Sequence, residues 1–195
     1  MTDEIKKQII IYLIEDDTSQ RESIESLLAF KGYLVKSFRN ANDFLKLNNI
    51  HRPSVLITDI HLPGQSGVDL HSELLKHSID FPVIFISGES TIQQSINAMK
   101  QGAFEFLVKP FDINDLIIAI EKACNFELKR LSLKELIKRL SPRENEVYTL
   151  LIKGLNNNEL MNKLNLSLPT VKQYKSEVMR KLEVKSLYEL ISLSN

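Results

Sequence analysis

Three segments of the sequence place charged side chains where an apolar run ends. Glu15, Asp16 and Asp17 follow one run, Asp59 ends a second, and Lys109 ends a third. Carboxylates that gather in one place repel one another unless a cation joins them, and Mg²⁺ prefers carboxylates, waters and a phosphate oxygen. A carboxylate nucleophile beside a bound cation and a fixed ammonium group is suited to phosphoryl transfer. This chemistry requires a fold that brings the three segments together.

Residues 8 to 111 alternate short apolar runs with amphipathic segments, which is typical of βα units around a parallel sheet. We expect strands at 8–14, 33–38, 55–59, 83–86 and 104–108, and helices at 19–31, 41–47, 68–77, 91–101 and from 112 onward. This order predicts a flavodoxin-like, doubly wound, five-stranded parallel α/β domain with strand order 2-1-3-4-5. The first and third strands then end side by side, so the acidic segments meet at one edge.

Asp59 is the central candidate at that edge. It follows apolar β-formers and precedes a turn that contains Pro63 and Gly67, as expected for a buried strand that ends at its carboxyl edge. Ser87 adds a hydroxyl group at the end of the fourth strand. Taken alone, Asp59 has a structural alternative, because Asp is a common first residue of turns. Asp17 is better explained as the N-terminal charge of the next helix than as a ligand.

These residues resemble the receiver domain of bacterial two-component response regulators, and the resemblance covers about residues 7 to 125. It implies that a sensor histidine kinase phosphorylates Asp59. It also implies a switch in which Ser87 hydrogen-bonds the phosphoryl group and the ring of Phe106 turns inward into the vacated space. This chain has Phe rather than Tyr at position 106, and the plain alternative is that Phe106 fills the core of a buried strand.

The resemblance also implies a Mg²⁺ cofactor, for which Mn²⁺ is a substitute. Asp16, Asp59 and the backbone carbonyl of His61 would ligate the metal ion, and Glu15, where the family usually has Asp, would act through a metal-bound water. Lys109 would pair with the phosphoryl oxygens, and its alternative is an ordinary surface lysine. Of the four histidines only His61 falls near the sheet edge, so the histidines do not form a metal set.

Composition and charge fit a chain of two domains. With 195 residues, of which 43% are hydrophobic and 26% charged, the chain can form two modest cores. Its apolar runs are too short to span a bilayer, its first residues lack a signal-peptide pattern, and its single Cys124 cannot form an intrachain disulfide. We therefore expect a cytoplasmic protein without a membrane partner. From Lys138 onward ten basic and six acidic residues give a net charge of +4, as expected for a DNA-binding module.

The segment 112–140 contains no Pro or Gly, and it predicts the last helix of the first domain with a helical extension, or with one break near Ser132. We place a receiver domain at 1–124, a helical linker at 125–140 and a DNA-binding domain at 141–195. Capping patterns in the last domain predict helices at 142–153, 157–163, 168–182 and 186–193. Two short helices, a tight connection and a longer basic helix form the helix-turn-helix pattern.

The second half carries characteristic residues at fixed spacing in the stretches 140–144, 154–157, 170–174 and 179–182. It resembles the LuxR-type helix-turn-helix domain of NarL/FixJ-type response regulators. The third helix is expected to bury the face formed by Val171, Tyr174, Val178 and Leu182. The resemblance implies DNA contacts for its polar side chains, with Lys172, Gln173 and Ser176 at base edges and Thr170, Lys175 and Arg180 at phosphates. For Lys175 and Arg180 the alternative is a solvated helix face.

Glu177 departs from the basic character of the third helix. It lowers the positive charge locally, and a salt bridge to Lys181, four residues on, is the expected compensation. A domain with a net charge of +4 is expected to bind DNA weakly, so high affinity requires a dimer on two half-sites. The helix 187–193 is the candidate contact for that dimer, and the alternative is that it covers its own core. In the first domain, the resemblance to receiver domains implies a dimer surface at about residues 91 to 122.

The sequence therefore predicts a transcription factor rather than an enzyme, in which phosphorylation of Asp59 favours dimers that bind double-stranded promoter DNA. Two alternatives stay open. A Mg²⁺-dependent phosphohydrolase with an aspartyl-phosphate intermediate would need a second acid/base group and a substrate pocket. A constitutive DNA-binding protein would use the first domain only as a dimerisation block. The intact set of Asp16, Asp59, Ser87 and Lys109 argues against the constitutive alternative.

Overall fold

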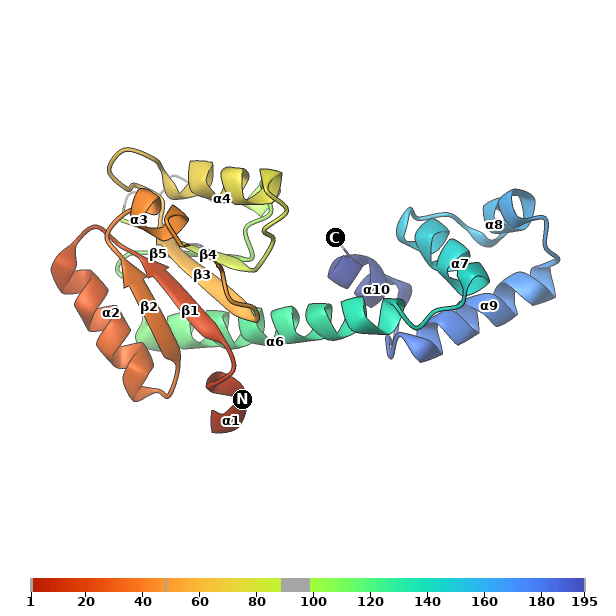
Figure 1. The fold of residues 1–195 in the computed structure, drawn as a ribbon, viewed down its shortest axis with the longest axis horizontal. Helices are drawn as coiled ribbons and strands as arrows, with labels where there is room; N and C mark the ends of the chain where they lie inside the picture. Colours follow the sequence, from red (N-terminus) through yellow and green to blue (C-terminus); the bar gives the residue numbers. More distant parts are fainter. Residues whose placement is uncertain (1, 48, 89–98, 195) are drawn as a thin grey trace. The chain divides into compact units, whose positions relative to one another are not determined.

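The computed structural model describes residues 2–47, 49–88 and 99–194. The chain forms two compact units, Met1–Glu127 and Leu128–Asn195. Within the described part of the first unit, five parallel strands form one sheet in the order β2-β1-β3-β4-β5 (Figure 1). The predicted fold class, a flavodoxin-like doubly wound sheet followed by a helical domain, is confirmed.

The strands are short and largely apolar because helices cover both faces of the sheet. They are β1 (Ile10–Ile14), β2 (Leu34–Phe38), β3 (Ser54–Asp59), β4 (Val83–Ser87) and β5 (Glu105–Val108). Each expected strand is confirmed to within two residues. Ile14 pairs with Thr58 and Asp59 pairs with Ile86. This register aligns the carboxyl ends of β1, β3 and β4 at one edge of the sheet.

The helices of the first unit differ little from those expected. They are α1 (Asp3–Lys6), α2 (Thr18–Phe30), α3 (Ala41–Leu45), α4 (Gly67–Lys76) and the start of α6 (Ile113–Ile137). Figure 1 shows α3 and α4 on one face of the sheet and α2 and α6 on the other. The side chain of Asp17 accepts a hydrogen bond from the backbone N–H of Gln20 at 2.8 Å, which confirms its expected capping role. Short α1 was not expected, and most of the helix expected at 91–101 lies outside the described residues.

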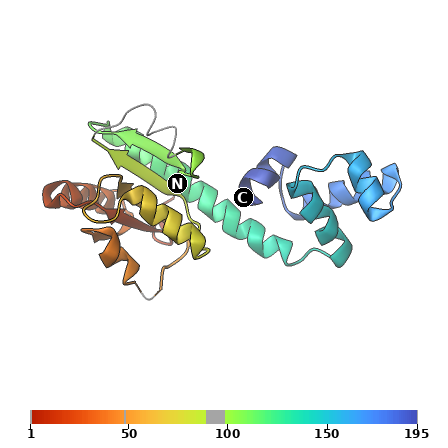
Figure 2. The ribbon, with the colours of Figure 1, turned by 90° about the horizontal axis from the view of Figure 1, so that it is seen from above.

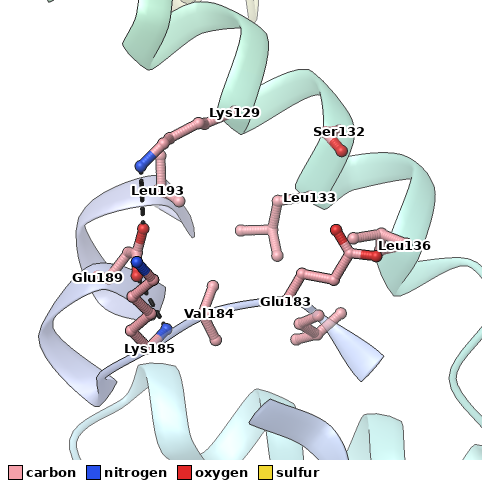
Figure 3. A pocket seen from close by; sticks show the side chains of 10 residues that line it. Lys129, Ser132, Leu133, Leu136, Glu183, Val184, Lys185, Glu189 and Leu193 are labelled. Atoms are coloured by element: carbon pink, nitrogen blue, oxygen red, sulfur yellow. Dashed lines mark hydrogen bonds and ion pairs between the residues drawn. The ribbon is translucent and has the colours of Figure 1, made fainter. Parts of the chain in front are cut away.

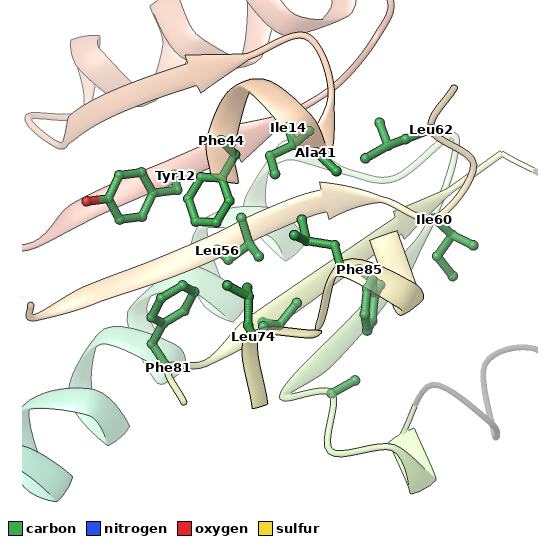
Figure 4. Close-up of a cluster of buried hydrophobic side chains, with 13 residues drawn as sticks. Tyr12, Ile14, Ala41, Phe44, Leu56, Ile60, Leu62, Leu74, Phe81 and Phe85 are labelled. Carbon is green, nitrogen blue, oxygen red and sulfur yellow. The ribbon is translucent and has the colours of Figure 1, made fainter. Parts of the chain in front are cut away.

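The core between the sheet and helices α3 and α4 is rich in aromatic side chains (Figure 4). Tyr12, Phe44 and Phe85 are fully buried in it, and the ring centroids of Tyr12 and Phe44 lie 5.3 Å apart in an edge-to-face arrangement. The Tyr12 hydroxyl accepts a hydrogen bond from the backbone N–H of His51 at 2.9 Å. Because this cluster is closely packed, the ends of strands β1, β3 and β4 have a rigid base.

The second unit contains the four helices expected for it, each within one residue of the predicted ends. They are α7 (Pro142–Ile152), α8 (Asn157–Leu164), α9 (Leu168–Lys181) and α10 (Leu187–Ser194), which Figure 2 shows in cyan to blue. Capping boxes start α7 at Ser141 and α8 at Asn156. Asn165, with φ of 52°, ends α8 in the left-handed region, where Asn is tolerated, and makes the tight turn before α9. Val171, Val178 and Leu182 are buried as expected, and Tyr174 is half-buried.

Helix α6 is unbroken from Ile113 to Ile137, so of the two forms expected the continuous extension is the correct one. Its residues from Leu128 onward belong to the second unit, where Leu133 is buried. Figure 3 shows Leu133 facing a hollow of about 340 Å³ between this part of α6 and α10. Leu190 and Leu193 of α10 are buried, so this face of α10 covers its own core. None of the described helices is long and apolar enough to cross a membrane.

Candidate functional site

Side chains from three strand ends meet at the carboxyl edge of the sheet. Asp59 is the last residue of β3, Glu15 follows β1, and Lys109 follows β5. The Lys109 ammonium group donates hydrogen bonds to Glu15 Oε2 and to Asp59 Oδ2, each at 2.7 Å. Glu15 is 2% exposed and Asp59 is 8% exposed. The fold therefore brings together three of the residues that the sequence singled out, although Glu15 and Lys109 are 94 positions apart. We call these three residues the charged strand edge.

The backbone after β3 fixes the Asp59 side chain. The N–H of His61 donates to Asp59 Oδ1 at 2.8 Å, so both carboxylate oxygens have a donor. The N–H of Gly67 donates to the carbonyl of Ile60 at 3.0 Å, which closes the turn. A Cβ atom at Gly67 would collide with the carbonyl oxygen of Asp59 and touch the side chain of Thr58. The turn is thus pressed against the strand end at a point where only glycine fits, a requirement that the sequence did not reveal.

Burial and charge act in opposite directions on the groups of the charged strand edge. Burial raises the pKa of the Glu15 carboxyl group, and the nearby Asp59 charge adds to this rise, while Lys109 opposes it. For Lys109, burial alone would lower the pKa, but the hydrogen bonds and charges of Asp59 and Glu15 together raise it. The Lys109 side chain therefore stays an ammonium ion at neutral pH. One ammonium ion serves two carboxyl groups.

The other predicted residues of this edge lie on or next to strands β1, β4 and β5. Asp16 is half-buried next to Glu15, and its backbone carbonyl accepts a hydrogen bond from Arg21 at 3.4 Å. Ser87 is fully buried at the end of β4, where its carbonyl accepts from the N–H of Lys109 at 2.8 Å. Phe106 is half-buried and packs against the aromatic core. Within the ranges that the structure describes, no three His, Cys, Asp or Glu side chains form a ready-made metal site.

The predicted DNA-contact residues lie on α9. Lys172, Gln173, Ser176 and Arg180 are exposed, whereas Thr170 and Lys175 are half-buried. The Lys175 ammonium group donates to the side-chain oxygen of Asn157, at the start of α8, at 3.0 Å. The hydroxyl oxygens of Thr170 and Ser167 lie 2.8 Å apart. The two half-buried residues are therefore held by side chains of their own unit.

Comparison with known proteins matches both units. A family model described as the response regulator receiver domain matches residues 11–121, and one described as bacterial regulatory proteins, luxR family, matches residues 138–194. The chain belongs to the NarL/FixJ-type response regulators. This response regulator is 37% identical to nodulation protein W of Bradyrhizobium diazoefficiens, over 98% of this chain and 87% of that protein. It is 31% identical to the transcriptional regulatory protein FixJ of Rhizobium meliloti, over 94% of each chain.

Solved structures of response regulators have the same architecture as this one. The response regulator StyR aligns over 96% of this chain and 98% of its own, with 34% identity and a TM-score of 0.60. Full-length FixJ from B. japonicum aligns over 96% of each chain, with 31% identity and a TM-score of 0.55. The similarity extends over both units, so this response regulator combines a receiver domain with a LuxR-type DNA-binding domain.

In the DNA-binding domain of this response regulator, the prediction of a salt bridge between Glu177 and Lys181 is wrong. Glu177 accepts hydrogen bonds from Arg180, at 2.7 Å from Nη2 and 3.2 Å from Nε. Lys181 instead lies 2.7 Å from Glu144 Oε1 and 2.8 Å from Glu144 Oε2. Glu144 is 7% exposed at the start of α7, so it draws Lys181 toward the interior of the domain. Glu177 then pairs with the cation three residues on.

Two residues that hold the helix-turn-helix together have partners that the sequence did not indicate. Glu144 closes the capping box of α7, accepting from the N–H of Ser141 at 2.8 Å, and also binds Lys181 at the end of α9. Arg143 donates to the carbonyl of Leu164, the last residue of α8, at 2.6 Å. The capping pattern revealed the start of α7. It gave no sign of these partners because they lie 37 and 21 residues away.

Proposed function

We propose that Asp59 of this response regulator accepts a phosphoryl group from a sensor histidine kinase, and that the modified chain dimerises and binds promoter DNA. The observation that carries the proposal is the charged strand edge, with Lys109 Nζ 2.7 Å from both Asp59 and Glu15. A carboxylate held by one backbone N–H and one ammonium group is oriented before its substrate arrives. Positioning of this kind is the main contribution that a protein makes to phosphoryl transfer.

The transfer forms an O–P bond at Asp59 as the P–N bond of the kinase phosphohistidine breaks, and the product is an acyl phosphate. Lys109 would then face the phosphoryl oxygens, whose negative charge its ammonium group stabilises. The group is accepted once for each signal and lost by slow hydrolysis. This response regulator is accordingly proposed as a phosphoryl acceptor and not as a turnover enzyme.

The residues at this edge fit a Mg²⁺ ion, or Mn²⁺ in its place. Glu15 and Asp59 share one ammonium ion, so the edge keeps an excess of negative charge, and Asp16 follows Glu15 directly. Carboxylate and carbonyl oxygens are the donors that Mg²⁺ prefers. Asp16, Asp59 and the carbonyl of His61 would hold the ion, with Glu15 acting through a water. The bound ion would neutralise charge on the incoming phosphoryl group.

We assign the conformational switch that follows phosphorylation to Ser87 and Phe106. Asp59 pairs in register with Ile86, the residue before Ser87, and Phe85 pairs with Phe106 on the next strand. A hydrogen bond from the Ser87 hydroxyl to the phosphoryl group would therefore act on the strand that pairs with β5, and the half-buried ring of Phe106 would turn inward in response. The proposed dimer surface at 91–122 carries exposed apolar side chains at Val108, Ile113 and Ile118. Its first eight residues lie outside the described residues.

DNA recognition is assigned to α9. Its exposed side chains Lys172, Gln173 and Ser176 would contact base edges, and Thr170, Lys175 and Arg180 would contact phosphates. Lys175 is anchored to Asn157, so its ammonium group would reach a phosphate from a fixed position. The buried face of α10 leaves Tyr188, which is 84% exposed, as the apolar side chain available to a second subunit.

The experiment that tests the proposal is a measurement of molar mass by light scattering in Mg²⁺, with and without beryllofluoride. We expect beryllofluoride, which binds a carboxylate as an analogue of the phosphoryl group, to convert monomers of the native protein into dimers and to leave Asp59→Asn unchanged. Asp17→Asn is the matched control, because Asn also caps a helix and the substitution removes one carboxylate from the same edge without touching Asp59. Loss of the shift in both variants would contradict the assignment to Asp59. DNA binding without any shift would favour the constitutive alternative.

A further inference from the structure

The recognition helix is less positive toward DNA than its composition indicates. Its four basic side chains are Lys172, Lys175, Arg180 and Lys181, all within the described residues. Lys175 is bound to Asn157, Arg180 to Glu177, and Lys181 to Glu144. Lys172 is exposed in the first half of the helix. Three of the four cations therefore have partners within the domain, and the partners of two, Arg180 and Lys181, are carboxylates that neutralise their charge.

The partnership of Arg180 differs from the other two. Lys175 and Lys181 bind residues of other helices, so their contacts hold the helices of the domain together. Glu177 and Arg180 lie on the same helix turn, and their side chains are 42% and 68% exposed. This pair buries little surface and adds little to the fold. Its charges instead face the solvent from which DNA approaches.

The position of Lys181 explains why Arg180 is the cation that Glu177 binds. Four residues after Glu177, Lys181 would be the usual partner on a helix. Glu144 removes Lys181 from that role with contacts of 2.7 and 2.8 Å to its two carboxylate oxygens. Arg180, three residues on, is left within reach and makes a bidentate contact with one Glu177 oxygen.

We propose that Glu177 sets the DNA affinity of a single subunit low by neutralising Arg180, so that promoter binding depends on dimerisation. The inference rests on the proposed role of α9 in DNA binding and adds its regulation. Each phosphate neutralised by a protein cation releases counterions, and an Arg paired with a carboxylate contributes little to this release. A weak single subunit leaves DNA free in the absence of signal, whereas a dimer multiplies two weak contacts on adjacent half-sites.

The test measures binding of the full chain, without phosphodonor, to a duplex of unrelated sequence by fluorescence anisotropy. For Glu177→Gln we expect affinity to rise about fivefold, the upper range for an exposed ion pair. The slope of log affinity against log salt is expected to steepen by about 0.9, equivalent to one additional phosphate contact. Arg180→Gln in the native background is expected to change the slope by much less than about 0.9, since in a single subunit Glu177 competes with phosphate for the Arg180 cation.

The double variant identifies the cation responsible. If Glu177 acts through Arg180, the gain seen in Glu177→Gln disappears in Glu177→Gln/Arg180→Gln. A gain of the same size in the double variant means that Glu177 simply repels phosphates, and it overturns the proposal. Glu146→Gln is the matched control, because Glu146 pairs with Arg143 at the same i, i+3 spacing on α7 and the substitution removes the same charge from the domain.

Failure of this inference differs from failure of the proposed function. If native protein binds DNA and Glu177→Gln binds no more tightly, the inference is wrong while α9 keeps its role. If neither the native protein nor Glu177→Gln binds any duplex even in the presence of beryllofluoride, the DNA-binding role of α9 is wrong. The ratio of binding with beryllofluoride to binding without it is expected to fall in Glu177→Gln, because the untreated monomer already occupies DNA.

Discussion

The charged strand edge of the receiver and the Glu177–Arg180 pair of the DNA-binding domain have the same shortest distance between opposite charges but lie in different surroundings. Both place a cationic nitrogen 2.7 Å from a carboxylate oxygen. At the edge, Glu15 and Asp59 are nearly buried, whereas Glu177 and Arg180 are largely exposed. Water screens the attraction between the exposed charges, whereas the attraction between the buried charges is screened much less. The same distance therefore represents a large energy in the receiver and a small one on α9.

The two regions also differ in what loss of the cation leaves behind. Without Lys109, two nearly buried carboxylates would face each other with no counter-charge. Without Arg180, Glu177 would simply be hydrated. A buried charge that loses its partner is costly, whereas an exposed charge is not. Stability measurements on matched variants of the two regions thus measure the effect of burial directly.

The largest effect is expected from Lys109→Met. This substitution should lower the free energy of unfolding by about 3 kcal/mol, because it leaves Glu15 and Asp59 unpaired in a nearly dry site. Urea unfolding followed by circular dichroism measures the change. Asp59→Asn, by contrast, removes one of two carboxylates that share an ammonium ion and should not destabilise the domain. The double variant Lys109→Met/Asp59→Asn should recover part of the loss, and no recovery would show that carboxylate repulsion is not the cause.

A smaller effect is expected from Gly67→Ala. The new Cβ atom would overlap the carbonyl oxygen of Asp59, so the turn or the strand end must move, at a cost of about 2 kcal/mol. Thermal unfolding measures the loss, and phosphorylation of Asp59 should slow as well. Gly88→Ala is the control, since a Cβ atom there meets nothing within 4 Å. Equal losses in both variants would show that the collision at Gly67 is not responsible.

An intermediate case is the ion pair between Glu144, which is buried, and Lys181, which is half-buried. The hydrogen bond from Lys181, followed by that from the Ser141 N–H, lowers the pKa of the Glu144 carboxyl group. A group with a lowered pKa stabilises the folded state above its unfolded pKa, and the contribution is lost as the pH falls. The native domain should therefore lose stability as the pH falls below about 4.5, the usual range of a Glu carboxyl group.

Glu144→Gln tests this pH dependence. At neutral pH the substitution should cost about 1 kcal/mol, because the capping contact remains possible but the charge pair is lost. Denaturant unfolding at several pH values should give a flatter curve for the variant than for the native protein. Parallel curves would assign the acid loss to other carboxylates.

The smallest effect on stability is expected from Arg180→Gln. Because the pair with Glu177 is exposed, the free energy of unfolding should be nearly unchanged. The same urea titration that detects Lys109→Met makes the comparison direct. A loss of similar size in the two variants would contradict the conclusion that burial separates them.

Much of the fold follows from local patterns in the sequence. Apolar runs, capping residues and glycines marked each strand of the described part of the chain to within two residues and the four last helices to within one. Such signals are reliable because periodicity and caps act within a few residues of each other. The order of the strands and the meeting of Asp59 with Glu15 and Lys109 followed from the rules of parallel sheets, which leave few topologies open.

The tertiary structure decided which partner each charged side chain takes. Glu177 had one cation three residues on and another four residues on, and Glu144, 37 residues from Lys181, made the choice between them. The collision that requires glycine at position 67 arises from a strand end that lies next to it in space. A sequence pattern specifies what a side chain can bind. Competition among distant groups for the same partner is settled only when the chain has folded, because charge and packing act through space and not along the chain.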